Sequence, residues 1–155
     1  MNRKWLLCGL LFLLFHFCNA QKLEMWYYPA LHLNGKSTMI CNGDSCTLQF
    51  DIIDRKDSTN ILWSELVLIP PEKIDEIRNL IDKASVIYDS ESYAFDGIWI
   101  TGCFTNDTTQ HYFKLMQPAS NSPEGVFCIT VIKTILKTVQ NRKTKGYIRT
   151  LKEYF

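Results

Sequence analysis

The stretch TLQFDII, residues 47–53, decides the fold class, because its apolar side chains recur at every second position. Leu48, Phe50 and Ile52 then fall on one face of a β-strand, and the residues between them face the other way. A polar turn and a second apolar run at 61–69 follow. This pattern predicts two neighbouring strands of an antiparallel sheet.

Helical and strand patterns alternate through the middle of the chain. In residues 71–84, isoleucine and leucine side chains recur on one stripe, directly after a proline pair, which predicts a helix. Strands are predicted at 97–104 and 110–117, because a polar connection of hairpin length separates two apolar runs.

The longest helical pattern begins at Pro123. Most of its circumference is apolar, so we expect it to lie across a sheet. The basic segment 141–146 is predicted to end this helix, with Gly146 past the cap, and residues 147–155 to add a last amphipathic turn or two. Together the patterns predict an α+β fold, a single antiparallel sheet of about four to five strands with two main helices packed on one face.

The amino terminus has the features of a signal peptide. Two basic residues precede the apolar run 5–15, and Cys18-Asn19-Ala20 ends it with small residues at the positions that a signal peptidase reads. The run is shorter than the roughly 20 residues that span a bilayer. We therefore expect a signal peptide at 1–20 and a single exported domain at 21–155, without an integral membrane segment after cleavage.

Composition and charge exclude several classes of protein. The chain has 155 residues, of which 46% are hydrophobic, with only 7 glycines and 5 prolines, so it is neither disordered nor collagen-like. Its net charge is +1, and loss of Arg3 and Lys4 with the signal peptide makes it −1. The remaining basic residues are scattered, and we therefore expect no nucleic-acid partner.

Four cysteines lie in the predicted exported domain, namely Cys41, Cys46, Cys103 and Cys128. An even number in an exported chain favours disulfides, for which three pairings are possible. Turn-forming residues between Cys41 and Cys46 would bring these two face to face across a hairpin, and we favour this pair together with Cys103–Cys128. For the second pair, free buried cysteines are the alternative.

The sequence contains no catalytic or metal-binding motif that we can identify. His32 and His111 lie beside no nucleophile motif, and G-x-S-x-G, H-E-x-x-H and C-x-x-C are all missing. Acidic residues gather at 51–57 and at 89–96, but neither group has the spacing of an EF-hand loop. We therefore predict no catalytic residue, no metal and no cofactor, although a site can still assemble from distant positions.

Trp26, Tyr27 and Tyr28 form the one cluster whose composition favours recognition. Aromatic side chains offer a large contact area with a polar end, so an exposed cluster would mark an interface for a protein, a glycan or an envelope surface. Packing against the open face of the sheet is the alternative.

Two local features resemble a known group of proteins. These are the step Asp96-Gly97-Ile98-Trp99 ahead of a hairpin and the carboxyl-terminal stretch YIRTLKEYF, residues 147–155. With a signal peptide that ends in Asn-Ala-Gln, the layout over most of the exported part resembles small exported, uncharacterised proteins of Bacteroidota bacteria. The resemblance implies a periplasmic or outer-surface location and carries over no catalytic residue.

These observations lead to one functional hypothesis and two alternatives. We expect an exported, periplasmic or secreted, non-enzymatic domain that binds a protein or an envelope component, with its oligomeric state open. One alternative is an exported hydrolase with a dispersed active site. The other is a secreted ligand of a eukaryote or virus, in which the sequon Asn106-Asp107-Thr108 would be glycosylated.

Overall fold

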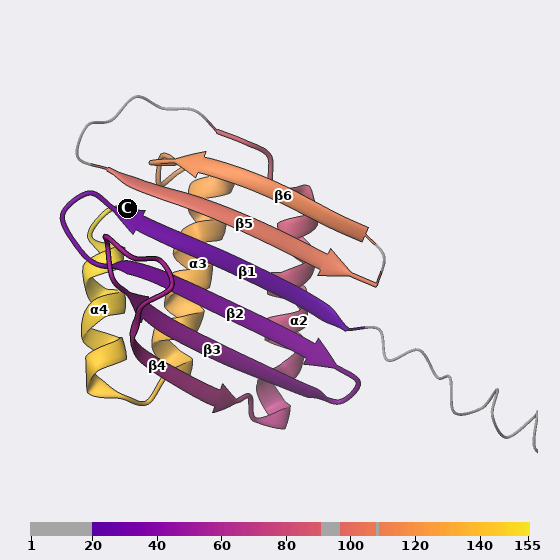
Figure 1. Ribbon diagram of the computed structural model, residues 1–155. Coiled ribbons are helices and arrows are strands. Elements are labelled where there is room, and N and C mark those ends of the chain that lie inside the picture. Colours follow the sequence, from indigo (N-terminus) through magenta and orange to yellow (C-terminus); the bar gives the residue numbers. More distant parts are fainter. Residues whose placement is uncertain (1–19, 91–96, 108) are drawn as a thin grey trace, which may run out of the picture.

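The computed structural model describes residues 20–90, 97–107 and 109–155, and shows a six-stranded sheet with helices behind one of its faces (Figure 1). The strand order is β4-β3-β2-β1-β5-β6, and every neighbouring pair is antiparallel. This confirms an α+β fold with one antiparallel sheet. The predicted strand number of four to five was too low.

Four strands come first, then a helix, a β-hairpin and two further helices. The strands are β1 (Gln21–Pro29), β2 (Asn34–Asn42), β3 (Ser45–Ile53), β4 (Ile61–Leu68), β5 (Ile98–Asn106) and β6 (Thr109–Met116). The helices are α2 (Ile74–Lys83), α3 (Pro123–Thr138) and α4 (Arg142–Lys152), and the 3-10 turns η1 (Pro71–Lys73) and η2 (Ala84–Val86) flank α2.

β1 lies at the centre of the sheet, between β2 and β5 (Figure 1). Leu23, Met25 and Tyr27 alternate along this strand and are fully buried against the helices. The strand begins at Gln21, whereas residues 1–19 of the predicted signal peptide lie outside the described residues. The first strand of the described chain therefore contributes side chains to the middle of the core.

The hydrophobic core lies between the sheet and the helix layer. Phe127 of α3 packs edge to face on Phe113 of β6, with ring centroids 6.1 Å apart. Gly102 on β5 makes room for this, because a Cβ there would lie 2.0 Å from Cζ of Phe113. A residue without a side chain is thus required where an aromatic ring crosses the neighbouring strand.

The basic segment 141–146 does not end the long helix, and that prediction was wrong. α3 ends at Thr138, and the Asn141 side chain accepts a hydrogen bond from the Lys143 backbone N–H at 2.8 Å. Asparagine is among the best N-cap residues, so this segment opens a separate helix, α4, instead of closing α3. Gly146 lies inside α4. The described chain therefore has three α-helices where two main helices were predicted.

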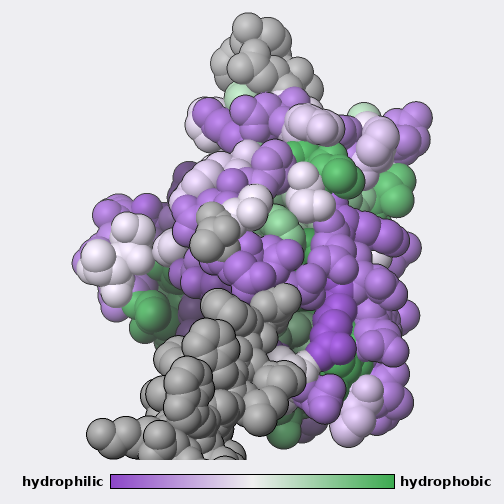
Figure 2. All heavy atoms as spheres, turned by 90° about the vertical axis from the view of Figure 1, so that its right-hand side faces the viewer, coloured by the Kyte–Doolittle hydropathy of each residue, from purple (hydrophilic) through white to green (hydrophobic). Residues whose placement is uncertain are grey.

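The end of the sheet where β1 begins shows a mainly hydrophilic described surface, with apolar side chains in small separate patches (Figure 2). No helix in the described part of the chain is long and apolar enough to cross a membrane. Exposed apolar side chains also lie on the face of the sheet that the described helices leave uncovered, among them Leu66, Leu68 and Trp99.

Candidate functional site

The described helices pack on one face of the sheet, and no described helix or strand covers the opposite face, here called the open face (Figure 1). Strand alternation assigns side chains to the open face in three rows across β1, β5 and β6. From one end to the other, the rows of opposed residues are Lys22, Thr105 and Gln110; Glu24, Cys103 and Tyr112; and Trp26, Thr101 and Lys114.

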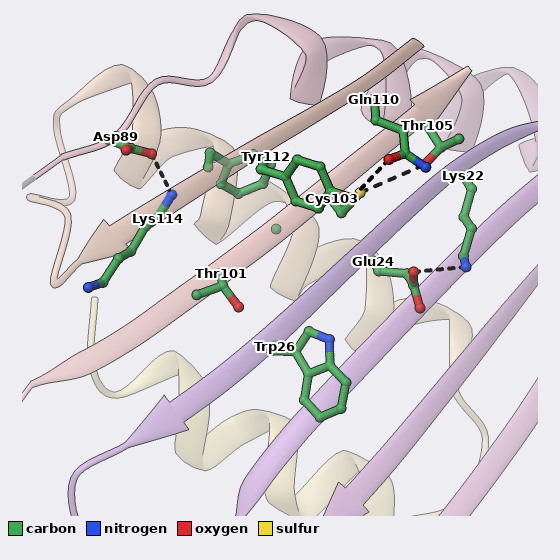
Figure 3. A pocket seen from close by; sticks show the side chains of 12 residues that line it. Lys22, Glu24, Trp26, Asp89, Thr101, Cys103, Thr105, Gln110, Tyr112 and Lys114 are labelled. Carbon is green, nitrogen blue, oxygen red and sulfur yellow. Dashed lines mark hydrogen bonds and ion pairs between the residues drawn. The ribbon is translucent and has the colours of Figure 1, made fainter. Parts of the chain in front are cut away.

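These rows line a groove of about 640 Å³ (Figure 3). Its floor consists of side chains from three neighbouring strands, and Asp89 contributes to its rim from the segment before residue 91. Asp89 is fixed there, because its Oδ1 accepts a hydrogen bond from the Lys114 backbone N–H at 2.7 Å. The groove is therefore built on rigid strand positions, which suits a preformed binding surface.

Glu24 lies at the centre of the groove, and a lysine on either side compensates the negative charge of its carboxylate. Its carboxylate lies 2.8 Å from Nζ of Lys22 and 2.7 Å from Nζ of Lys36. Partial burial tends to raise the pKa of Glu24, but hydrogen bonds and charge from the two lysines outweigh it and lower the pKa below its usual value. The carboxylate therefore stays ionised and holds both lysines on the surface.

Lysines also lie over the tryptophan rings of this face. Nζ of Lys36 is 4.7 Å from the ring centroid of Trp26, and Nζ of Lys114 is 4.9 Å from that of Trp99. Trp26 stacks in parallel with Tyr28, two residues along β1, at 6.4 Å between centroids. The cation–π contacts fix the rings against the sheet and leave a surface that is both aromatic and polar.

Cys103 and Tyr112 lie side by side in the middle row (Figure 3). The Cys103 side chain, through a hydrogen bond first and its charge second, is the main reason that the pKa of Tyr112 is raised above its usual value. The Tyr112 hydroxyl also donates to Oε1 of Gln110 at 2.8 Å, and the Cys103 sulfur lies 3.7 Å from Oγ1 of Thr105. The thiol is thus surrounded by hydroxyl and amide groups.

The structure divides the predicted aromatic cluster between the two faces. Trp26 and Tyr28 lie on the open face, whereas Tyr27 is fully buried on the helix side, where its hydroxyl lies 3.0 Å from Oγ of Ser37. The three residues share a strand, so alternation alone separates them. Trp26 belongs to the groove, and Tyr27 belongs to the core.

One of the two favoured disulfides is present. Cys41 and Cys46 are directly opposed on β2 and β3 and are bonded to each other, which confirms the first pair. The Cys103–Cys128 pairing was wrong, because both thiols are free. Cys103 projects from β5 into the groove on the open face, whereas Cys128 is buried on α3 against the other face, so the sheet separates them.

The histidines lie outside the groove. His111 is on β6, where its Nε2 lies 2.6 Å from the Ile87 carbonyl oxygen, and His32 packs edge to face on Tyr154 near the carboxyl end of the chain. Neither imidazole is among the groove residues that surround the Cys103 thiol.

The acidic residues at 51–57 have separate structural roles. Asp51 accepts hydrogen bonds from Gln49 and Ser64, while Asp54 and Asp57 bind backbone N–H groups of their own turn. Glu91 and Asp96 of the second acidic group lie outside the described residues. Among the residues that are described, no three His, Cys, Asp or Glu side chains form a group that could hold a metal ion.

The sequence reasoning identified only part of this site. Trp26 and Cys103 were singled out, but Lys22, Glu24 and Lys114 were not. The sequence does contain a pattern that could have predicted β1, since Leu23, Met25 and Tyr27 alternate with polar or amphipathic residues. No local signal shows that β5 lies beside β1, and this long-range pairing is what assembles the groove.

No model of a known protein family matches the sequence, and no curated protein is significantly similar to it.

Proposed function

We propose that this chain is an exported, non-enzymatic binding domain that docks a protein or an envelope component on the open face of its sheet. The observation that carries this proposal is the groove over β1, β5 and β6, which lies on the face that none of the described helices covers. A globular domain gains stability by burying such a face, so an aromatic face that is left open is typical of a contact surface.

The side chains around the groove suit a partner that is both apolar and polar. Trp99 and Tyr112 are 46% and 67% exposed and offer aromatic contact area. Thr101, Thr105 and Gln110 add hydrogen-bonding groups beside them. The central carboxylate is already paired with two lysines, so binding does not require a charged ligand to compensate it.

The surroundings of Cys103 favour binding over hydrolysis. A thiol nucleophile is activated by an adjacent base or by a positive environment. Here the groups near the sulfur are the Thr105 hydroxyl and the Tyr112 phenol, and both described histidines of the exported part make contacts elsewhere.

Export is part of the proposal and has two supports. The Cys41–Cys46 disulfide joins two strands in the core, and such bonds persist mainly in oxidising compartments. The apolar amino terminus and the layout that resembles small exported proteins of Bacteroidota would place the mature domain in the periplasm or on the outer surface.

Site-specific photo-crosslinking in the cells that produce the protein tests the docking face. A photoreactive phenylalanine analogue at Tyr112 should give a defined adduct with the partner. The same analogue at Lys133, an exposed position on the outer side of α3, is the matched control and should give none. An adduct from position 133 without one from position 112 would place the docking surface on the helix layer and refute the proposal.

A further inference from the structure

The two edges of the sheet differ in how their backbone groups are satisfied. The outer edge of β6 is covered at its carboxyl end, because the Ser90 N–H donates to the Lys114 carbonyl oxygen at 3.1 Å and the Met116 N–H donates to the Ser90 carbonyl oxygen at 3.0 Å. Among the described residues, no backbone group pairs with the outer edge of β4. An uncovered edge strand is a template for another strand.

The outward backbone groups of β4 can be assigned. The Ile69 N–H donates to the Cys46 carbonyl oxygen at 2.8 Å, so the backbone of Ile69 faces β3. Strand alternation then turns the backbone groups of Val67 and Glu65 towards β3 as well. Those of Leu68 and Leu66 point outward, and they are free to bond an added strand.

The side chains of the same residues form an apolar flank. Leu66 and Leu68 lie on the open-face side of β4 and are 69% and 70% exposed. Natural edge strands are commonly protected by lysine, proline or a covering loop. β4 has no lysine and no proline. Its edge therefore offers both backbone hydrogen bonds and apolar contacts.

The other flank of β4 is basic. α4 begins behind this strand, where Trp63 Nε1 donates to Thr144 and Glu65 accepts from the Gln140 and Asn141 backbone N–H groups. Nζ of Lys143 lies 4.9 Å from the Trp63 ring centroid. The first turn of α4 also contains Arg142 and Lys145 and has no acidic residue, and the helix dipole adds positive potential at this end.

From these observations we infer a second binding surface, independent of the groove: the outer edge of β4 pairs with an extended segment of another protein that alternates apolar and acidic residues. The apolar side chains of that segment would contact Leu66 and Leu68, and its carboxylates would lie beside the basic start of α4. Backbone hydrogen bonds supply affinity in this mode of recognition, and alternate side chains supply specificity.

A second copy of the chain fits this edge less well. Antiparallel pairing of β4 with itself would place the two α4 helices on the same side of a continuous sheet. Their basic first turns, with Arg142 and Lys143, would then lie close to each other across the twofold axis. Repulsion between these basic turns disfavours self-pairing. An acidic segment would instead be attracted to the basic start of α4.

Titration of a fluorescent peptide that alternates glutamate and valine tests the inference by anisotropy. The wild-type protein should bind it, more weakly as salt is added.

Leu66→Pro removes an outward N–H at an edge position where proline is tolerated, and should weaken binding at least about tenfold. Lys143→Glu should weaken it several-fold without unfolding α4, because an acidic residue suits a helix's first turn. Tyr112→Ser, in the groove, is the matched control and should bind like the wild type.

Four results would overturn the inference. The first is a wild-type protein that does not bind the peptide, and the second is a folded Leu66→Pro variant that binds it equally well. The third is equal binding of a peptide that alternates lysine and valine, which would remove the charge argument. The fourth is a dimer of the chain that Leu66→Pro dissociates, because the edge would then belong to a second copy.

Discussion

Neighbouring residues of β1 serve opposite faces of the sheet. Tyr27 is fully buried under the helices, while Tyr28, the next residue, is 37% exposed and stacks on Trp26 on the open face. The same residue type thus holds the core together at one position and shapes a surface at the next. The helix-covered face thus holds most of the buried core, and the open face is available for binding.

The largest expected effect is a difference in stability between two tyrosine variants. Tyr27→Ser should cost about 3–5 kcal/mol in the free energy of unfolding, because it removes a buried ring and its hydrogen bond to Ser37. Tyr28→Ser should cost less than about 1 kcal/mol. Urea denaturation measures both. Similar losses of unfolding free energy in the two variants would mean that the two faces of the sheet do not differ in their contribution to stability.

The disulfide on the helix side gives the next largest effect. Replacement of Cys41 and Cys46 by serine should cost about 2 kcal/mol, because the bond closes only a short loop in the unfolded chain. Cys103→Ser, on the open face, is the control and should change the free energy of unfolding by less than about 0.5 kcal/mol. An equal loss in the control would show that Cys103 contributes to the core.

Acid should weaken the fold through carboxylates on both faces. Burial tends to raise the pKa of Glu65, but hydrogen bonds from Thr144 and from the start of α4, with the charge of Lys145, lower it overall. The pKa of Glu24 is lowered by its two lysines. Since both pKa values are lower in the folded state, the stabilisation is complete above the usual glutamate range and is lost as pH falls from about 5 through the lowered values.

Urea titrations between neutral and acidic pH measure this loss. Glu65→Gln and Glu24→Gln should each flatten the acid side of the profile and lower stability at neutral pH. A Glu65→Gln protein whose stability still falls with acid as steeply as that of the wild type would show that Glu65 does not contribute.

The smallest effect concerns the two free thiols. In the native protein, an alkylating reagent should modify Cys103, which lines the groove, and should leave Cys128 unmodified. Burial raises the pKa of Cys128 to about 12, so its thiol stays protonated as well as inaccessible. Mass spectrometry of the intact protein counts the labels, and two labels before unfolding would contradict the assignment of the two cysteines to separate faces.

Some of the fold could be predicted from local patterns. The period of two in residues 47–53 and the turn between Cys41 and Cys46 identified β3 and the disulfide, because both signals lie within a few residues. The start of α4 was predicted wrongly, because the basic residues at 141–146 suit the end of a helix, whereas Asn141 is an N-cap residue that begins a new one.

The site was harder to predict, because it depends on contacts between distant strands. Along β5, Cys103 falls on the same face as Trp99 and Thr101, whereas Ile98 and Ile100 fall on the buried face. The position of Cys103 on the open face could therefore have been inferred from strand alternation. The position of β5 beside β1 could not be inferred from the sequence. Without this pairing, nothing indicates that Glu24 and Tyr112 lie in the same groove.

The central claim is that the open face binds a partner and contributes little to folding. Its most direct test is the double variant Trp99→Ser/Tyr112→Ser, assayed for its free energy of unfolding and for cross-linking from a photoreactive residue at Thr101. The account predicts a free energy within about 1 kcal/mol of that of the wild-type protein and loss of the adduct. A stable variant that still forms the adduct, or a variant that unfolds, would contradict it.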